Sequence, residues 1–190
     1  TSSALDELAY FAMSKLIEVC EEFSKEFCIS FNPNKSKTIL FSKDNSECQP
    51  FCMQGENIDI VSHEKHLGNI VGTNALDKHI DACINELYCN VNMLMSQFST
   101  VHIDTLYALF KSFCMTVYGS SLWDFSHKVC DKFYTAWRKS IRKIFSLSPR
   151  THTCLLHLLC LDCPIDVQLH LRFIKFFYSC ANSNNSCVQI

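Results

Sequence analysis

The sequence has little of what tight turns and membrane spans require. Glycine and proline occur four times each in 190 residues, so tight turns should be few and helices should dominate. Long apolar runs are also missing, since the stretch 114–123 is interrupted by polar residues and 154–161 contains His157. Neither approaches the roughly 18 residues that a spanning helix needs. We therefore expect no membrane association.

The N-terminus lacks an initiator methionine and any basic segment followed by an apolar one. It therefore predicts no signal peptide, and it is typical of a fragment or a processed chain. Cysteine, by contrast, is abundant, and 13 is an odd number that excludes complete pairing. A chain of this length does not need disulfides to fold. We expect free thiols and an intracellular protein, nuclear or cytoplasmic.

Charge is distributed unevenly along the chain. Residues 1–30 carry six acidic residues against two lysines, a net of −4, whereas residues 131–190 carry eight basic residues against three aspartates, a net of +5. A phosphate-binding surface is therefore expected in the last third.

Periodicity divides the chain near residue 75. A long first helix should pack through one apolar stripe, formed by Leu5, Leu8, Ala12, Leu16, Val19, Cys20, Phe23 and Phe27. Alternating residues on either side of Asn32-Pro33-Asn34 predict a hairpin within 28–42, and residues 58–71 predict a second pair of short strands. Gly68 and Gly72 are expected at close backbone approaches.

The remainder of the chain should be helical. Helices are predicted from about residue 76, with Ile80, Ile84, Leu87, Val91 and Leu94 on one face, from about 105 to 118 and from about 126 to 145. Pro149 marks the end of the third, and 162–164 separates two later helices.

Four local patterns occur in an order that resembles LINE-like (non-LTR) retrotransposon reverse transcriptases. The first is a helix that ends over 20–23, followed by Phe31-Asn32-x-x-Lys35-Ser36-Lys37 and an apolar strand, and the second is His63-Glu64-Lys65-His66-Leu67-Gly68. The third is Val117-Tyr118-Gly119 through Trp123. The fourth is Ala136-Trp137-Arg138-Lys139-x-x-Arg142-Lys143-Ile144, with Thr151-His152, Pro164-Ile165 and Arg172 behind it. In the present sequence, His66 occupies the position where this family usually has Tyr.

The resemblance implies a C-terminal palm remnant over 1–75 and a helical thumb with its following connection over 76–190. The implied activity is RNA-directed DNA polymerisation by two metal ions on aspartates, with Mg²⁺ in the intact parent and an RNA template and DNA primer as partners. This sequence has no Asp-Asp pair and no Tyr-x-Asp-Asp. We therefore expect no catalytic residue, no cofactor and no polymerase activity in this chain alone.

The resemblance also implies roles for particular residues. Lys35 would lie near the triphosphate in the intact parent, although in the isolated chain it reads as a solvated turn lysine. His66, Leu67 and Gly68 would hold the primer backbone, glycine permitting close approach of a phosphate. The alternative for these three is a simple hairpin with Leu67 in the core.

One helix supplies physical evidence for nucleic-acid binding. Phe133, Trp137, Ile141 and Ile144 fall in one arc, and the opposite side carries the cations Lys132, Arg138, Lys139, Arg142 and Lys143. Such a helix docks by its apolar face and offers the cations to phosphates. A solvated basic face, a membrane-surface helix and a calmodulin target have the same pattern.

A second pattern, Cys154-x-x-His157-x-x-Cys160-x-x-Cys163, has zinc-ligand residue types. On one helix these four groups spread around the axis, so buried free thiols are the preferred interpretation.

The sequence thus predicts an α+β, mostly helical fold and a truncated polymerase segment that grips a template–primer duplex. The alternative is a non-catalytic helical interaction module derived from a retroelement. Strands 28–72 without their sheet neighbours would leave an edge exposed, which predicts self-association.

Overall fold

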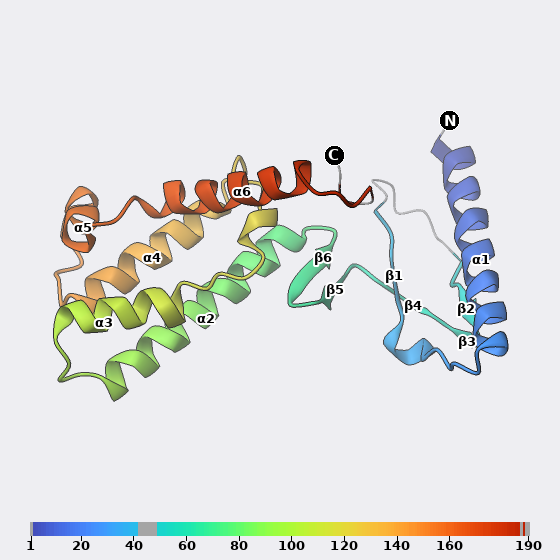
Figure 1. The fold of residues 1–190 in the computed structure, drawn as a ribbon, viewed down its shortest axis with the longest axis horizontal. Helices are drawn as coiled ribbons and strands as arrows, with labels where there is room; N and C mark the ends of the chain where they lie inside the picture. The colour runs from blue at the N-terminus through green and yellow to red at the C-terminus, as the bar shows by residue number, and fades with distance from the viewer. Residues whose placement is uncertain (1, 42–48, 187, 189–190) are drawn as a thin grey trace. The chain divides into compact units, whose positions relative to one another are not determined.

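The computed structural model describes residues 2–41, 49–186 and 188 (Figure 1). They form two compact units, one of residues 1–64 and 71–73 and the other of residues 65–70 and 74–190. The α+β, mostly helical class is confirmed. Each unit has its own hydrophobic core.

The first unit is built from α1 (Ser2–Glu26), a 3-10 turn (Pro33–Lys35) and four short strands. β1 (Lys37–Ile39) pairs in parallel with β4 (Asp59–Val61), and Lys37 forms an ion pair of 2.5 Å with its register partner Asp59. β2 (Cys52–Met53) and β3 (Glu56–Asn57) form an antiparallel hairpin. Its turn residues Gln54 and Gly55 both have positive φ, as a two-residue hairpin turn requires.

The predicted hairpin around Asn32-Pro33-Asn34 is wrong. Among the described residues no strand precedes the turn. Pro33 opens the 3-10 turn, and the partner of β1 is β4, about twenty residues further on. A parallel partner requires a crossover rather than a local turn. Turn chemistry at Asn32-Pro33 therefore could not reveal it.

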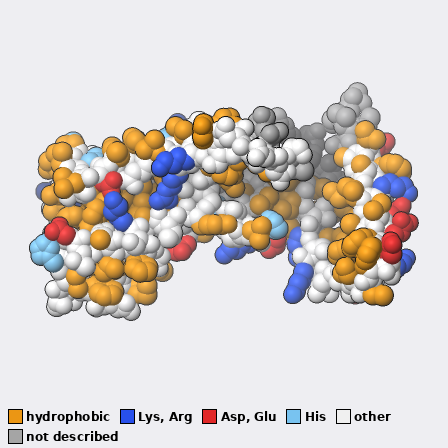
Figure 2. Space-filling view, viewed as in Figure 1, with side chains coloured by type: hydrophobic (Ala, Val, Ile, Leu, Met, Phe, Trp, Pro, Cys, Tyr) orange, Lys and Arg blue, Asp and Glu red, His pale blue; other side chains and the backbone are white. Residues whose placement is uncertain are grey.

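The predicted packing of α1 is also wrong, although its periodicity is right. The core of this unit is Phe51, Met53 and Ile58, against which Tyr10, Ile17 and Phe31 pack. Most of the expected stripe is exposed, at 63% for Leu8, 59% for Leu16 and 61% for Val19, whereas Cys20 is half-buried and borders a hollow beside the core. Figure 2 shows hydrophobic side chains along α1 accordingly. The side chain of Leu5 lies outside the described part.

The second unit is a helical assembly centred on α4 (Cys130–Ile144). α2 (Ala75–Gln97) packs along it, and α3 (Ile103–Leu109), α5 (Thr153–Cys160) and α6 (Ile165–Ala181) also contact it. The predicted apolar arc of α4 is confirmed, because Phe133, Trp137, Ile141 and Ile144 are all at most 2% exposed. The predicted face of α2 is confirmed for Ile80, Leu87, Val91 and Leu94, which are buried.

The helix predicted from 105 to 118 is shorter than expected. The α-helical part, α3, ends at Leu109, and a π-helical turn follows it directly over Phe110–Cys114. The Arg172 guanidinium on α6 then donates to the carbonyls of Met115 (2.9 Å) and Thr116 (3.3 Å). These carbonyls are therefore satisfied by a side chain rather than by a further helical turn.

Two remaining features complete the fold. β5 (His63–His66) and β6 (Asn69–Gly72) form a two-stranded sheet with Leu67 and Gly68 between the strands. Within the described residues no single helix is long and apolar enough to cross a membrane. Only α5 and α6 taken together, bent by 62°, have that length and apolarity.

Candidate nucleic-acid interface

The basic side of α4 borders an open groove of about 580 Å³. The groove is lined by Thr135, Arg138, Lys139, Arg142, Lys143, Leu147, Pro149 and Thr153. Four of these eight side chains are cationic and none is acidic. Side chains of one charge sign that line a hollow focus their electrostatic field within it. The positive potential of this groove therefore attracts anions.

The five predicted cations of α4 are not equivalent in their surroundings. Lys132 lies outside the groove and is paired with Asp77 (2.9 Å) and Asp81 (3.6 Å) on α2. The Asp77 hydrogen bond, aided by both carboxylates, raises the pKa of Lys132 above its usual range. Lys132 is therefore already neutralised by the protein itself.

Arg142 has a structural partner although it lines the groove. Its Nε and one Nη donate to the carbonyl oxygen of Thr151 at 3.2 and 2.8 Å. The guanidinium thus ties the segment after α4 back to the helix. Part of its donor capacity is unavailable to a ligand.

Lys139 and Arg138 are the cations most available to a ligand. Among the described residues neither has a hydrogen-bond or ion-pair partner in the protein, and Arg138 Nε is buried without one. Lys139 also lines two adjoining hollows, one beside Tyr88 and Asn92 and one beside Lys128 and Asp131. Lys143 donates to Asn92 Oδ1, a neutral partner that leaves its charge uncompensated.

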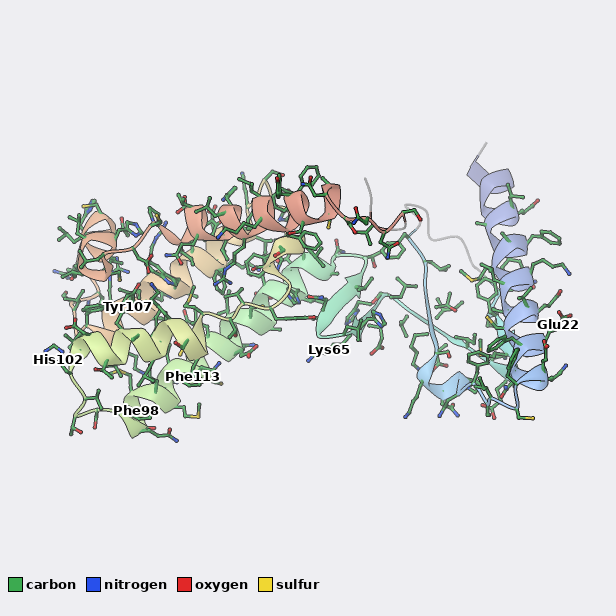
Figure 3. The ribbon with its side chains drawn as sticks, in the orientation of Figure 1. Glu22, Lys65, Phe98, His102, Tyr107 and Phe113 are labelled. Carbon is green, nitrogen blue, oxygen red and sulfur yellow. The ribbon has the colours of Figure 1, made fainter. Side chains whose placement is uncertain are left out.

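The hairpin tip carries the second set of predicted residues. Leu67 and Gly68 both have positive φ, 47° and 85°, as expected for a two-residue turn that matches the twist of its strands. Leu67 is 78% exposed, so the interpretation that placed it in the core is wrong. His66 and Lys65 are exposed beside it, Lys65 on β5 as labelled in Figure 3.

Gly68 lies against an aromatic ring that the sequence did not associate with it. A Cβ at this position would be 2.9 Å from Tyr118 Cε1. A Cβ at Gly119 would be 1.8 Å from Asn69 Oδ1. The motifs at 66–68 and 117–123 therefore meet in space, and both glycines are required for that contact. The close approach predicted at Gly72 is also confirmed, with Ser62 O 2.3 Å from an added Cβ.

His79 on α2 supports this junction and was missed from the sequence. Its Nε2 lies 3.1 Å from the Tyr118 carbonyl oxygen, and its ring meets the edge of Trp123 at a centroid distance of 6.1 Å. It is 8% exposed. The hydrophobic positions around it on α2 were the only sequence signal that it faces inward.

Lys35 lies in the first unit, at the end of the 3-10 turn, with an exposed side chain. Its backbone amide donates to Asn32 O at 3.1 Å. The structure thus gives it the position of a turn lysine.

The Cys154–Cys163 pattern is divided among different surroundings. Cys154 is exposed with its Sγ 2.9 Å from His152 Nδ1, His157 stacks on Trp137 at 5.8 Å, and Cys163 is exposed beyond α5. In residues 2–41, 49–186 and 188, no three such side chains come together as metal ligands.

Cys160 belongs instead to a polar contact between α3 and the end of α5. Tyr107 (Figure 3) donates to Asp162 at 3.3 Å, and Lys111 pairs with the same carboxylate at 2.6 Å. Burial, the Cys160 hydrogen bond and the Asp162 charge raise the pKa of Tyr107 well above its usual range. The phenol therefore stays protonated, and the contact is structural.

Comparisons with protein-family models, with curated proteins and with solved structures find no match for this chain.

Proposed function

We propose that this chain contributes the template–primer-binding part of a non-LTR retrotransposon reverse transcriptase, with residues 1–75 as palm remnant and 76–190 as thumb. One observation carries the proposal: the groove beside α4 has four cationic side chains and no acidic one. The four sequence motifs resemble those of reverse transcriptases, and we infer the ligand of the groove from that resemblance. The ligand is the sugar–phosphate backbone of an RNA–DNA duplex.

The proposed contact is electrostatic and independent of base sequence. Lys139, Arg138 and Lys143 meet phosphates, and each neutralised phosphate releases condensed counterions. The exposed hairpin tip at Lys65, His66 and Leu67 provides a second contact to the same backbone. Catalysis belongs to an aspartate pair and Mg²⁺ ions that the intact parent supplies, and no step of it is assigned to these residues.

The test is a titration with a fluorescent RNA–DNA hybrid at several salt concentrations. Loss of one phosphate contact lowers the salt slope by roughly 0.9 and the affinity at 0.1 M salt by about 8-fold. We expect this result for Lys139→Gln. The control is Lys132→Gln, which removes the same charge from the same helix, but at a side chain already paired with Asp77.

The two variants separate a local contact from a general charge effect. If both variants lose the same hybrid affinity, binding depends on the net charge of the chain and not on the groove. An affinity of the unmodified chain that does not change with salt, or no affinity at all, would reject the proposal.

A second candidate is the non-catalytic interaction module, favoured by the exposed face of α6. Val167, Leu171, Ile174 and Tyr178 recur at helical spacing and are 41–69% exposed. A module of this kind would bind a partner through this face and would show no salt-dependent affinity for the hybrid.

A further inference from the structure

The groove beside α4 is bordered by a serine with the features of a modification site. Ser148 lies between two groove-lining residues, Leu147 and Pro149. It is exposed and belongs to no helix or strand. Ser148-Pro149 is the only Ser-Pro or Thr-Pro dipeptide in the sequence, and Arg150 follows it.

The segment that carries Ser148 is held to α4 at both ends. The Leu147 amide donates to the Arg142 carbonyl at 2.7 Å, and the Arg142 guanidinium binds Thr151 O at 2.8 Å. Within it, Ser148 Oγ accepts from the Arg150 amide at 3.3 Å, and Ser148 O accepts from the Thr151 amide at 3.0 Å. The hydroxyl oxygen thus belongs to an ordered turn, and the residues on either side of Ser148 line the cationic groove.

We propose that Ser148 is phosphorylated by a proline-directed serine/threonine kinase and that the phosphate closes the groove to nucleic acid. In this reaction a bond forms between Ser148 Oγ and the γ-phosphorus of ATP while the bond to the β–γ bridging oxygen breaks. ADP leaves, and the hydroxyl proton passes to the carboxylate base of the kinase.

The local structure tolerates this modification. The turn uses Ser148 Oγ only as an acceptor, and phosphate oxygens are stronger acceptors for the Arg150 amide. The added charge of about −1.5 to −2 would stand between two residues that line a groove with four cationic and no acidic side chains. The modification therefore leaves the turn intact and neutralises about two of the charges proposed to bind nucleic acid.

The effect on binding rests on the proposed function, whereas the modification itself does not. Two positive charges fewer lower the salt slope by about 1.8 and the hybrid affinity at 0.1 M salt by roughly 60-fold. Independently of nucleic acid, neighbouring cations lower the second pKa of the phosphate by about one unit relative to the unfolded chain.

The experiment treats the full chain with ATP and a proline-directed kinase and locates the phosphate by peptide mass spectrometry. We expect modification at Ser148 that is lost in Ser148→Ala and strongly reduced in Pro149→Ala, which keeps the hydroxyl. A ³¹P NMR titration then compares the phosphate in the native chain and in urea. In Lys139→Gln/Lys143→Gln, the pKa difference should shrink.

The outcomes distinguish this inference from the proposed function. No phosphate at Ser148, or an identical phosphate pKa in the native chain and in urea, overturns the inference. Phosphorylation with the shifted pKa, in a chain that never binds the hybrid, supports the modification site and rejects the proposed function. Phosphorylation that leaves a measurable hybrid affinity unchanged overturns the closing of the groove.

Discussion

Replacing Arg142 with lysine tests whether this cation acts by structure or by charge. The substitution keeps the positive charge but loses the forked pair of donors that reaches Thr151 O at 3.2 and 2.8 Å. A hydrogen bond from a charged donor contributes about 1.5–3 kcal/mol. Because the side chain is half-buried and lysine restores part of the contact, we expect a loss of about 1–2 kcal/mol in the free energy of unfolding.

The assay is urea unfolding followed by tryptophan fluorescence. Trp123 and Trp137 are the only tryptophans and both lie in the core of the second unit, so their emission reports that unit alone. The hybrid affinity and its salt slope should stay close to those of the unmodified chain, because the charge is retained. An unchanged unfolding midpoint together with an affinity loss like that of Lys139→Gln would refute the structural role of Arg142.

Three further predictions concern other parts of the chain. Gly68→Ala should destabilise the second unit by about 1 kcal/mol or more, since its φ is +85° and the ring of Tyr118 occupies the space of a Cβ; adding Tyr118→Ala should recover the steric share, and equal losses in both backgrounds would exclude the contact. Burial raises the pKa of Cys114 to about 11, so the unfolded chain loses this proton first and stability should fall between about pH 9 and 11; urea midpoints that do not change over this range would contradict it. Leu16 on α1 is 59% exposed, so Leu16→Glu should reduce self-association in size-exclusion chromatography. Tyr10→Glu should instead unfold the first unit, because the ring of Tyr10 stacks on that of Phe51 at a centroid distance of 4.8 Å. An unmodified chain that is already monomeric would contradict the prediction for Leu16.

The helices were predictable where local signals decide them. The apolar period of α4 and its termination before Pro149 are sequence properties, and so is the break at Pro164 between α5 and α6. The helix predicted from 105 to 118 is shorter in the structure, and a distant residue contributes to its end. Met115 and Thr116 leave the helical path with their carbonyls bound by Arg172, more than fifty residues away, and no local pattern contains that information.

α1 shows a different limit of sequence patterns. Its periodicity correctly predicted that Leu8, Leu16 and Val19 share one face, but a helical stripe does not say what covers it. The narrower face through Tyr10 and Ile17 packs in its place, because Phe51 and Ile58 lie there. Which of two faces is buried depends on partners that are distant in sequence.

The candidate site was predictable in composition but not in the availability of its charges. A helical wheel places Lys132 and Lys139 on the same basic side of α4. The structure separates them, since Asp77 on α2 pairs with Lys132 while Lys139 has no acidic residue within its groove. The pairing joins residues fifty-five positions apart, so it follows from the packing of α2 on α4 rather than from the charge pattern.

Leu67 is the position where local physics and burial disagree most strongly. The first residue of such a turn favours Asn, Asp or Gly, and a leucine at φ 47° costs on the order of 1 kcal/mol. Its side chain is 78% exposed and recovers little of that cost by burial. The adjoining Gly68 is explained by the ring of Tyr118, whereas no contact within the described part of the second unit explains the leucine. The proposed nucleic-acid contact at this tip, which Lys65 and His66 flank, would cover the leucine where the protein itself does not, so the hairpin and the α4 groove should be tested together.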